Sequence, residues 1–198
     1  DEMLELASLG ASVLHPRAVE IARNYGVLMV VRSSWSEAPG TRLTSRRGRP
    51  LNQTGLELGS PVDGVEQMEH QAVIALSHIP DQPGIAARLF ETLSGAGINV
   101  DLIIQSTHEG SSNDITFTVA EADLDAARRV SQTVLDSLGG ELAAEGGMTK
   151  LSISGAGIMG RPGIAAGLFH CLSQQGINLR LIATSEVKVS CVIDADSG

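Results

Sequence analysis

The sequence predicts an α+β protein in which one small strand–helix–strand–strand unit is present twice. The stretch DQPGIAARLFETLSGAGIN at 81–99 returns as GRPGIAAGLFHCLSQQGIN at 160–178, with Pro83 aligned to Pro162. Runs rich in β-branched residues with alternating polarity flank both copies, and such runs are typical of half-buried strands. We therefore interpret the repeat as one supersecondary unit that has been duplicated once.

The first copy continues into a complete βαββαβ order, which is the ferredoxin-like arrangement of an antiparallel sheet with its helices on one face. A Pro-Gly pair starts the first helix, and Gly97 is expected to end it. Ile85, Leu89 and Leu93 give that helix one apolar face. The remaining expected elements are strands at 71–79, 98–106, 114–120 and 140–145, and a second helix at 123–138.

The second copy repeats the unit only as far as its third strand. Its expected strands cover 148–156, 177–185 and 187–194. Gly198 corresponds to a position before the second helix of the first copy. We therefore expect this copy to be truncated at its C-terminus, or to be covered on that face by another element. The shared apolar residues predict two similar shells related by a pseudo-two-fold axis, and the changed polar residues predict unlike sites.

The N-terminal segment differs from the repeat. We expect a helix at 16–26 and a buried strand at 27–34, followed by a polar boundary rich in Gly and Pro at 36–55. Four arginines of this boundary form a local basic cluster, which is either a solvated loop or a contact for an anionic partner. They are Arg42, Arg46, Arg47 and Arg49.

Composition and charge exclude several classes of function. A net charge of −9 argues against a general nucleic-acid binder, because such a protein needs basic surface. No apolar run approaches the roughly 18 residues of a membrane-spanning helix. Cys171 and Cys191 form no disulfide framework, so we predict a cytoplasmic protein with free thiols. We find no residue pattern of a catalytic or metal site.

The start of the first repeated helix is the best candidate for a ligand site. The first turn of a helix has unpaired backbone N–H groups and a partial positive charge, so a carboxylate can bind there. Asp81 precedes this helix, and Asp101 and Gln105 lie four residues apart on the next strand, where alternation predicts a common face. Carboxylates beside an anion-accepting helix start suit a free amino acid. Asp81 could instead be an ordinary helix N-cap.

The repeat resembles the ACT domain, a ferredoxin-like unit that senses small molecules, and the whole chain resembles the C-terminal regulatory region of aspartokinases. The most specific parts are the lead-in VLHPRAVE…VVRSSWSEAPGT, ISGAGIMGRPG and IATSEVKVS. The similarity covers most of the chain, in the stretches 11–43, 81–106, 113–118 and 161–193.

This resemblance implies a domain organisation and a neighbouring catalytic domain. Residues 1–50 would be the tail of an amino-acid-kinase domain, and 61–70 would add a strand to the second ACT domain. The first ACT domain would cover 71–146 and the second 147–198. The preceding kinase domain would hold MgATP and phosphorylate aspartate in lysine, threonine and methionine biosynthesis, so this segment alone would be non-catalytic. ACT domains of two chains would pair into a homodimer.

The resemblance also implies two effector sites. In the lysine-like site, Ala165 stands where some relatives have a Thr that contacts lysine. Binding of free threonine is therefore the stronger expectation. The carboxylates of Asp101 and Glu186 nevertheless suit the ammonium of a lysine ligand. The lysine-like site comprises Asp101, Ala165, Ser185 and Glu186. The threonine-like site comprises Asp81, Gly84, Ala86 and Gln105, with the backbone of Asn178 and Leu179 from the second chain.

The implied mechanism is allosteric inhibition, in which bound effectors favour one packing of the ACT dimer and hold the kinase domain in a weakly active state. Concerted control by lysine plus threonine and control by a single effector both remain open. One rival is the ACT-type regulatory subunit of another enzyme, such as a branched-chain amino-acid synthase. Two others are an RNA-binding ferredoxin-like module, disfavoured by the scarcity of aromatics, and a small hydrolase that would need an Arg-Asn pair.

Overall fold

A computed structural model describes the chain apart from residues 1–2, 4–5, 8–12, 45–61, 63, 109–111, 156–157, 159–161, 186 and 198. The chain divides into two compact units. The first comprises 1–66, 152–171 and 184–189, and the second comprises 67–151, 172–183 and 190–198. In the described part of the chain, no helix is both long and apolar enough to cross a bilayer.

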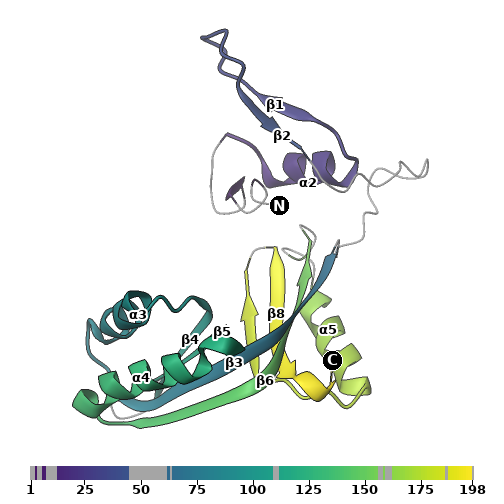
Figure 1. Ribbon diagram of the computed structural model, residues 1–198. Coiled ribbons are helices and arrows are strands. Elements are labelled where there is room, and N and C mark those ends of the chain that lie inside the picture. Colours follow the sequence, from purple (N-terminus) through teal and green to yellow (C-terminus); the bar gives the residue numbers. More distant parts are fainter. Residues whose placement is uncertain are drawn as a thin grey trace. The chain divides into compact units, whose positions relative to one another are not determined.

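A six-stranded sheet in the order β4-β5-β3-β6-β8-β7 organises the repeat (Figure 1). Strand β5 pairs with both β3 and β4 in antiparallel register, and the predicted α+β class with antiparallel sheet is confirmed. The strands are β3 (Gly64–Pro80), β4 (Val100–His108), β5 (Ser112–Ala120), β6 (Glu141–Ser154), β7 (Leu181–Thr184) and β8 (Lys188–Asp194). The helices are α3 (Ile85–Gly95), α4 (Leu124–Leu138) and α5 (Ile164–Gln174), with 3-10 turns at Glu121–Asp123 and Ala195–Ser197.

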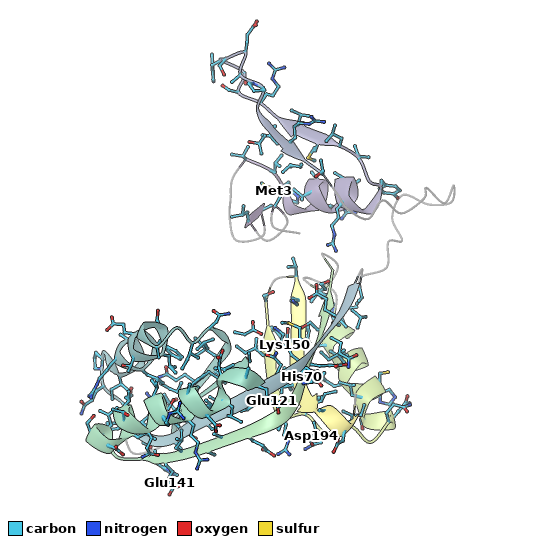
Figure 2. All side chains as sticks on the ribbon, viewed as in Figure 1. Met3, His70, Glu121, Glu141, Lys150 and Asp194 are labelled. Atoms are coloured by element: carbon cyan, nitrogen blue, oxygen red, sulfur yellow. The ribbon has the colours of Figure 1, made fainter. Side chains whose placement is uncertain are left out.

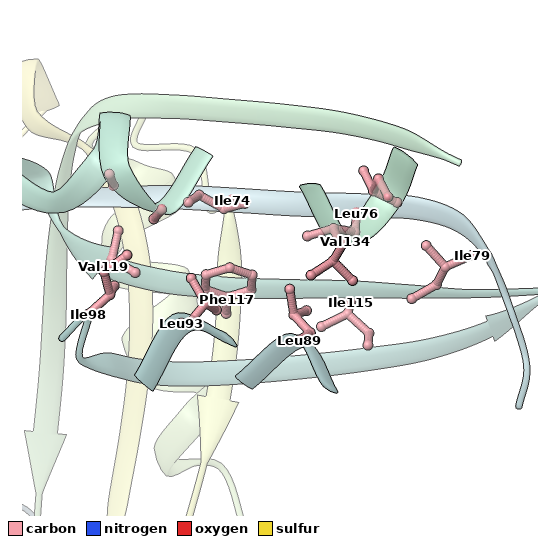
Figure 3. Close-up of a cluster of buried hydrophobic side chains, with 13 residues drawn as sticks. Ile74, Leu76, Ile79, Leu89, Leu93, Ile98, Ile115, Phe117, Val119 and Val134 are labelled. Atoms are coloured by element: carbon pink, nitrogen blue, oxygen red, sulfur yellow. The ribbon is translucent and has the colours of Figure 1, made fainter. Parts of the chain in front are cut away.

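The main core lies between α3, α4 and one face of β3 and β5 (Figure 3). Leu89 and Leu93 of α3 are fully buried, as the spacing of four residues predicted. The ring of Phe90 meets Phe117 of β5 edge to face, with the centroids 5.6 Å apart. Burial of this apolar face fixes the position of the N-terminus of α3 relative to β5, and that position matters for the site below.

Both repeated helices end in the same way. Gly97 has a φ of +74° and Gly176 a φ of +72°, a conformation that glycine adopts without steric cost. The next N–H in each copy, that of Ile98 or Ile177, donates to the carbonyl of a leucine in the last helical turn at 3.0 Å. The helix α3 ends at Gly95 with Ala96 as its C-cap, and Gly97, predicted as the cap, is the next residue and takes the left-handed conformation.

Strands β3 and β6 are each continuous where the sequence predicted two strands, and β3 joins the expected segments 61–70 and 71–79. The sequence predicts separate strands at 140–145 and 148–156, but β6 is one strand from Glu141 to Ser154. Gly147 takes a φ of +69°, so the strand bends without ending. The carboxylate of Glu121 accepts the Gly147 N–H at 2.8 Å and lies 3.5 Å from His70 Nδ1 of β3, which also has a positive φ (Figure 2).

The N-terminal segment forms α2 (Pro16–Asn24) and a two-stranded sheet of β1 (Met29–Val31) and β2 (Thr41–Leu43). The predicted buried strand at 27–34 is wrong in two respects, because it is only three residues long and Val27, Leu28 and Val30 are exposed. These side chains are exposed because the sheet of β1 and β2 has only two strands, which cover little apolar surface. Strand β2 lies in the region predicted as a boundary, where the Arg32 side chain donates to the carbonyls of Glu37 and Ala38 and closes the connection. The arginines Arg46, Arg47 and Arg49 lie outside the described residues.

The strand predicted at 177–185 is also shorter, because β7 begins only at Leu181. The N–H of Ile177 donates to a carbonyl in the last turn of α5, and it is therefore not available for pairing in the sheet. Arg180 donates its N–H to Val192 of β8 at 2.8 Å, and regular pairing starts after it.

Candidate functional site

The N-terminus of α3 is an open helix start. Its N-cap is Gly84, which has a φ of +95° and therefore favours glycine, and no side chain caps the helix. The first helical N–H, that of Ile85, makes only a long contact of 3.4 Å with the carbonyl of Gln82. The N–H groups of the first turn, including that of Ala86, have no partner within the helix and can bind an anion such as a carboxylate.

Asp81 is exposed and does not cap this helix, so the interpretation of Asp81 as an ordinary N-cap is wrong. Its carboxylate instead accepts a hydrogen bond at 2.7 Å, from the side-chain nitrogen Nδ2 of Asn113 to Oδ1 of Asp81. Asn113 lies on β5, 32 residues further along the chain. The bond fixes a carboxylate beside the uncapped helix start, where it can meet a cationic group.

Gln105 lies near the same corner of the sheet. In the β4–β5 register, Gln105 is opposite Ile115, and Thr107 is opposite Asn113. Residues directly opposite one another in antiparallel strands share a face, so Gln105 is on the face of Ile115, the face on which α3 packs. Three of the four first-chain residues of the predicted threonine-like site, Asp81, Gly84 and Ala86, therefore lie at the start of α3, and Gln105 lies two residues from the position opposite Asn113. Their roles stay predictions.

Asn113 is the residue of this corner that sequence reasoning missed. It is 5% exposed, and its Oδ1 is buried without a partner among the described residues. An unsatisfied buried acceptor costs roughly 1–3 kcal/mol. The sequence does contain a pattern that could have indicated it. Positions 113, 115, 117 and 119 alternate along the strand, and Asn113 is the polar residue among three apolar ones.

Asp101, the central residue of the lysine-like site, already has a partner. Lys150 of β6 donates to its carboxylate, and the lysine side chain is only 7% exposed whereas that of Asp101 is 39% exposed. An irregularity in the β4–β5 register lies between Val100 and Ile103. The four-residue spacing of Asp101 and Gln105 therefore no longer fixes a common face, as we had expected from simple alternation.

The other predicted residues lie in the second copy. Ala165 is half-buried in the first turn of α5. Ser185 follows β7, is exposed, and donates its N–H to the carbonyl of Lys188 at 2.8 Å. Asn178 and Leu179 lie between α5 and β7, Asn178 exposed and Leu179 half-buried. Glu186 lies outside the described residues. The roles of these five residues stay predictions.

The second copy keeps the backbone of the helix start, and a positive residue takes the sequence position of Asp101. Gly163 has a φ of +99°, close to that of Gly84 at the matching position. Arg180 replaces Asp101, and its Nε donates to Asp194 at 2.9 Å while Glu145 lies 3.5 Å away. The bond to Asp194 and the two negative charges raise the pKa of the Arg180 guanidinium. The two copies therefore share a shape and differ in electrostatics.

Known proteins resemble this chain along its whole length. The ACT domain family matches residues 74–133 and 151–198. An aspartokinase of Thermus thermophilus is 41% identical over 198 residues, which are 99% of this chain and 47% of that protein. The crystal structure of an aspartate kinase from Synechocystis has 52% identity and a TM-score of 0.85, covering 100% of this chain and 35% of that one.

The crystal structure of the ligand-free regulatory subunit of aspartate kinase from Thermus thermophilus is also similar. Its identity is 39% and its TM-score 0.65, covering 69% of this chain and 91% of that chain. The chain spans about half the length of the curated relatives that it matches.

Proposed function

Since this chain belongs to the ACT domain family and matches aspartate kinases along its whole length, we propose that it is the allosteric regulatory region of an aspartate kinase. In this proposal it binds free threonine, and lysine more weakly, as feedback inhibitors of aspartate phosphorylation. The whole-length relatives favour this function over the regulatory subunit of another biosynthetic enzyme.

The observation that supports threonine binding best is the open start of α3 beside the fixed carboxylate of Asp81. An amino acid is a zwitterion, so its site must offer a partner for each charge. The first-turn N–H groups of α3 suit the ligand carboxylate, and Asp81 suits its ammonium. Gln105, on the same face of the sheet, has an amide that can bind the side-chain hydroxyl of threonine.

Lysine is the weaker effector in this proposal. The Asp101 carboxylate that would bind it already accepts a hydrogen bond from Lys150. A lysine ligand would have to displace or share this internal ammonium. Ala165 supplies no hydroxyl at the position where some relatives have a Thr. We therefore propose that lysine acts together with threonine rather than alone.

Inhibition of the attached kinase domain requires that the effector binds one state of the regulatory region better than the other. We propose that the second chain of a homodimer completes the threonine site with the backbone of Asn178 and Leu179. Binding would then favour one packing of the dimer. The kinase domain, with its MgATP, would respond to that packing.

Calorimetric titration of this chain with threonine, lysine, methionine and the pair threonine plus lysine tests the proposal. We expect heat with threonine and none with methionine. Asp81→Ala removes charge-assisted hydrogen bonds worth about 1.5–3 kcal/mol, so it should weaken threonine about 10- to 100-fold. Asp125→Ala, which removes an exposed carboxylate of α4, is the matched control and should bind threonine as the unchanged chain does. Absence of any heat with threonine would contradict the proposal.

A further inference from the structure

Two buried side-chain atoms have no hydrogen-bond partner among the described residues, and one of them adjoins the proposed site. These atoms are Oγ of Ser131 in α4 and Oδ1 of Asn113 in β5. Asn113 is the one that contacts a predicted ligand residue, because its Nδ2 donates to Asp81 at 2.7 Å. An ionised carboxylate can only accept, so the amide nitrogen has to face Asp81 and the amide oxygen has to face the protein interior.

The surroundings of Asn113 do not favour a polar residue on grounds of stability. It is paired opposite Ile79 on β3 and lies on the face of Ile115 and Phe117, all of which are buried. An apolar side chain of similar size would pack there without leaving an acceptor unpaired. A buried polar group that is not fully satisfied calls for a functional reason, and the contact with Asp81 supplies one.

We propose that Asn113 is a positioning residue of the threonine-like site. Its amide holds Oδ1 of Asp81, so that Oδ2 is presented to the ammonium of an amino acid whose carboxylate lies at the start of α3. This inference rests on the proposed function and adds a residue to it. Asn113 touches Asp81 and acts through it, and it gives the site its selectivity for ligands with a free α-ammonium.

A double-mutant cycle on threonine affinity separates positioning from mere support of the fold. The variants are Asn113→Ala, Asp81→Ala and the double variant, each titrated with threonine by calorimetry. We expect Asn113→Ala to weaken threonine roughly tenfold, as the loss of a charge-assisted hydrogen bond predicts. In the Asp81→Ala background the same change should have no further effect, because there is no carboxylate left to hold.

Asn113→Leu is the control that distinguishes a loss of threonine binding from a loss of folded structure. It fills the buried position with an apolar side chain of similar size, so its melting temperature should equal or exceed that of the unchanged chain while its threonine affinity falls about tenfold. Unchanged threonine affinity in both Asn113 variants would overturn the inference and leave the proposed function standing. Full additivity of the Asp81 and Asn113 losses would also overturn it. If the unchanged chain bound no threonine, the proposed function itself would fail.

Discussion

Replacing Asp101 with Ala should destabilise the fold because it leaves the ammonium of Lys150 without its partner. The Lys150 side chain is 7% exposed, and Asp101 is its partner among the described residues. Water can reach the outer part of Asp101 but scarcely reaches the lysine. The variant therefore keeps a buried positive charge and removes the group that compensates it.

The size of this effect follows from the burial of the two groups. Breaking a buried ion pair by removing one partner costs about 3–5 kcal/mol. Since the Asp101 side chain is 39% exposed, solvent already screens one end of the pair, and we expect the lower end of that range, about 3 kcal/mol. For a chain of this size such a loss lowers the melting temperature by roughly 6–12 °C.

Urea unfolding followed by circular dichroism measures this loss, with Lys150→Met and the double variant as partners in a cycle. Methionine fills the buried position without a charge, so Lys150→Met and the double variant should each lie within about 1.5 kcal/mol of the unchanged chain. Glu91→Ala, which removes an exposed carboxylate on α3, is the control. The reasoning is refuted if Asp101→Ala is as stable as the control, or if the double variant is as unstable as Asp101→Ala.

Three further predictions concern ligand binding, backbone conformation and pH. Lys150→Met should free Asp101 and raise lysine affinity about tenfold in calorimetry; an unchanged or lower affinity would show that Lys150 does not compete with the ligand. Gly84→Ala should cost about 1–2 kcal/mol in urea unfolding because Gly84 has a φ of +95°, whereas Gly95→Ala at the end of the same helix should be neutral or stabilising. Burial raises the pKa of the Cys191 thiol above its ordinary value of 9.0, so the fold favours the neutral thiol. The contribution of the buried thiol to the free energy of unfolding is complete below pH 9 and is lost as the pH rises above it. The variant Cys191→Ala should therefore lose less stability at alkaline pH. An equal loss of stability in both proteins would contradict this prediction.

The sequence predicted the helices because they depend on local patterns. Regular spacing of Ile85, Leu89 and Leu93 defines α3, and Gly97 takes a positive φ directly after its C-cap. The charge needs of an amino acid directed attention to Asp81 and Gln105. Asp81 precedes α3 and accepts a hydrogen bond from Asn113, and Gln105 lies opposite Ile115 on β5; their roles in a site stay predictions.

Features that depend on distant parts of the chain could not be predicted in this way. The pair of Asp101 and Lys150 joins residues 49 positions apart, and the bond between Asp81 and Asn113 joins residues 32 apart. The N–H of Gly147 in β6 likewise donates to the carboxylate of Glu121, which lies 26 positions earlier in another element. Local alternation does not settle the face of Asp101, because a register irregularity lies between Val100 and Ile103.

The most direct test of the account is an NMR titration of the isotope-labelled chain with threonine, observed through the nitrogen and proton signals of the backbone amides. The account predicts that the largest changes are at Gly84 and Ala86, together with the side-chain amide signals of Asn113 and Gln105. In Asp81→Ala the same changes should require about 10- to 100-fold higher threonine concentrations. Amide signals at the start of α3 that stay unmoved at saturating threonine would contradict the central claim that this helix start binds the amino acid.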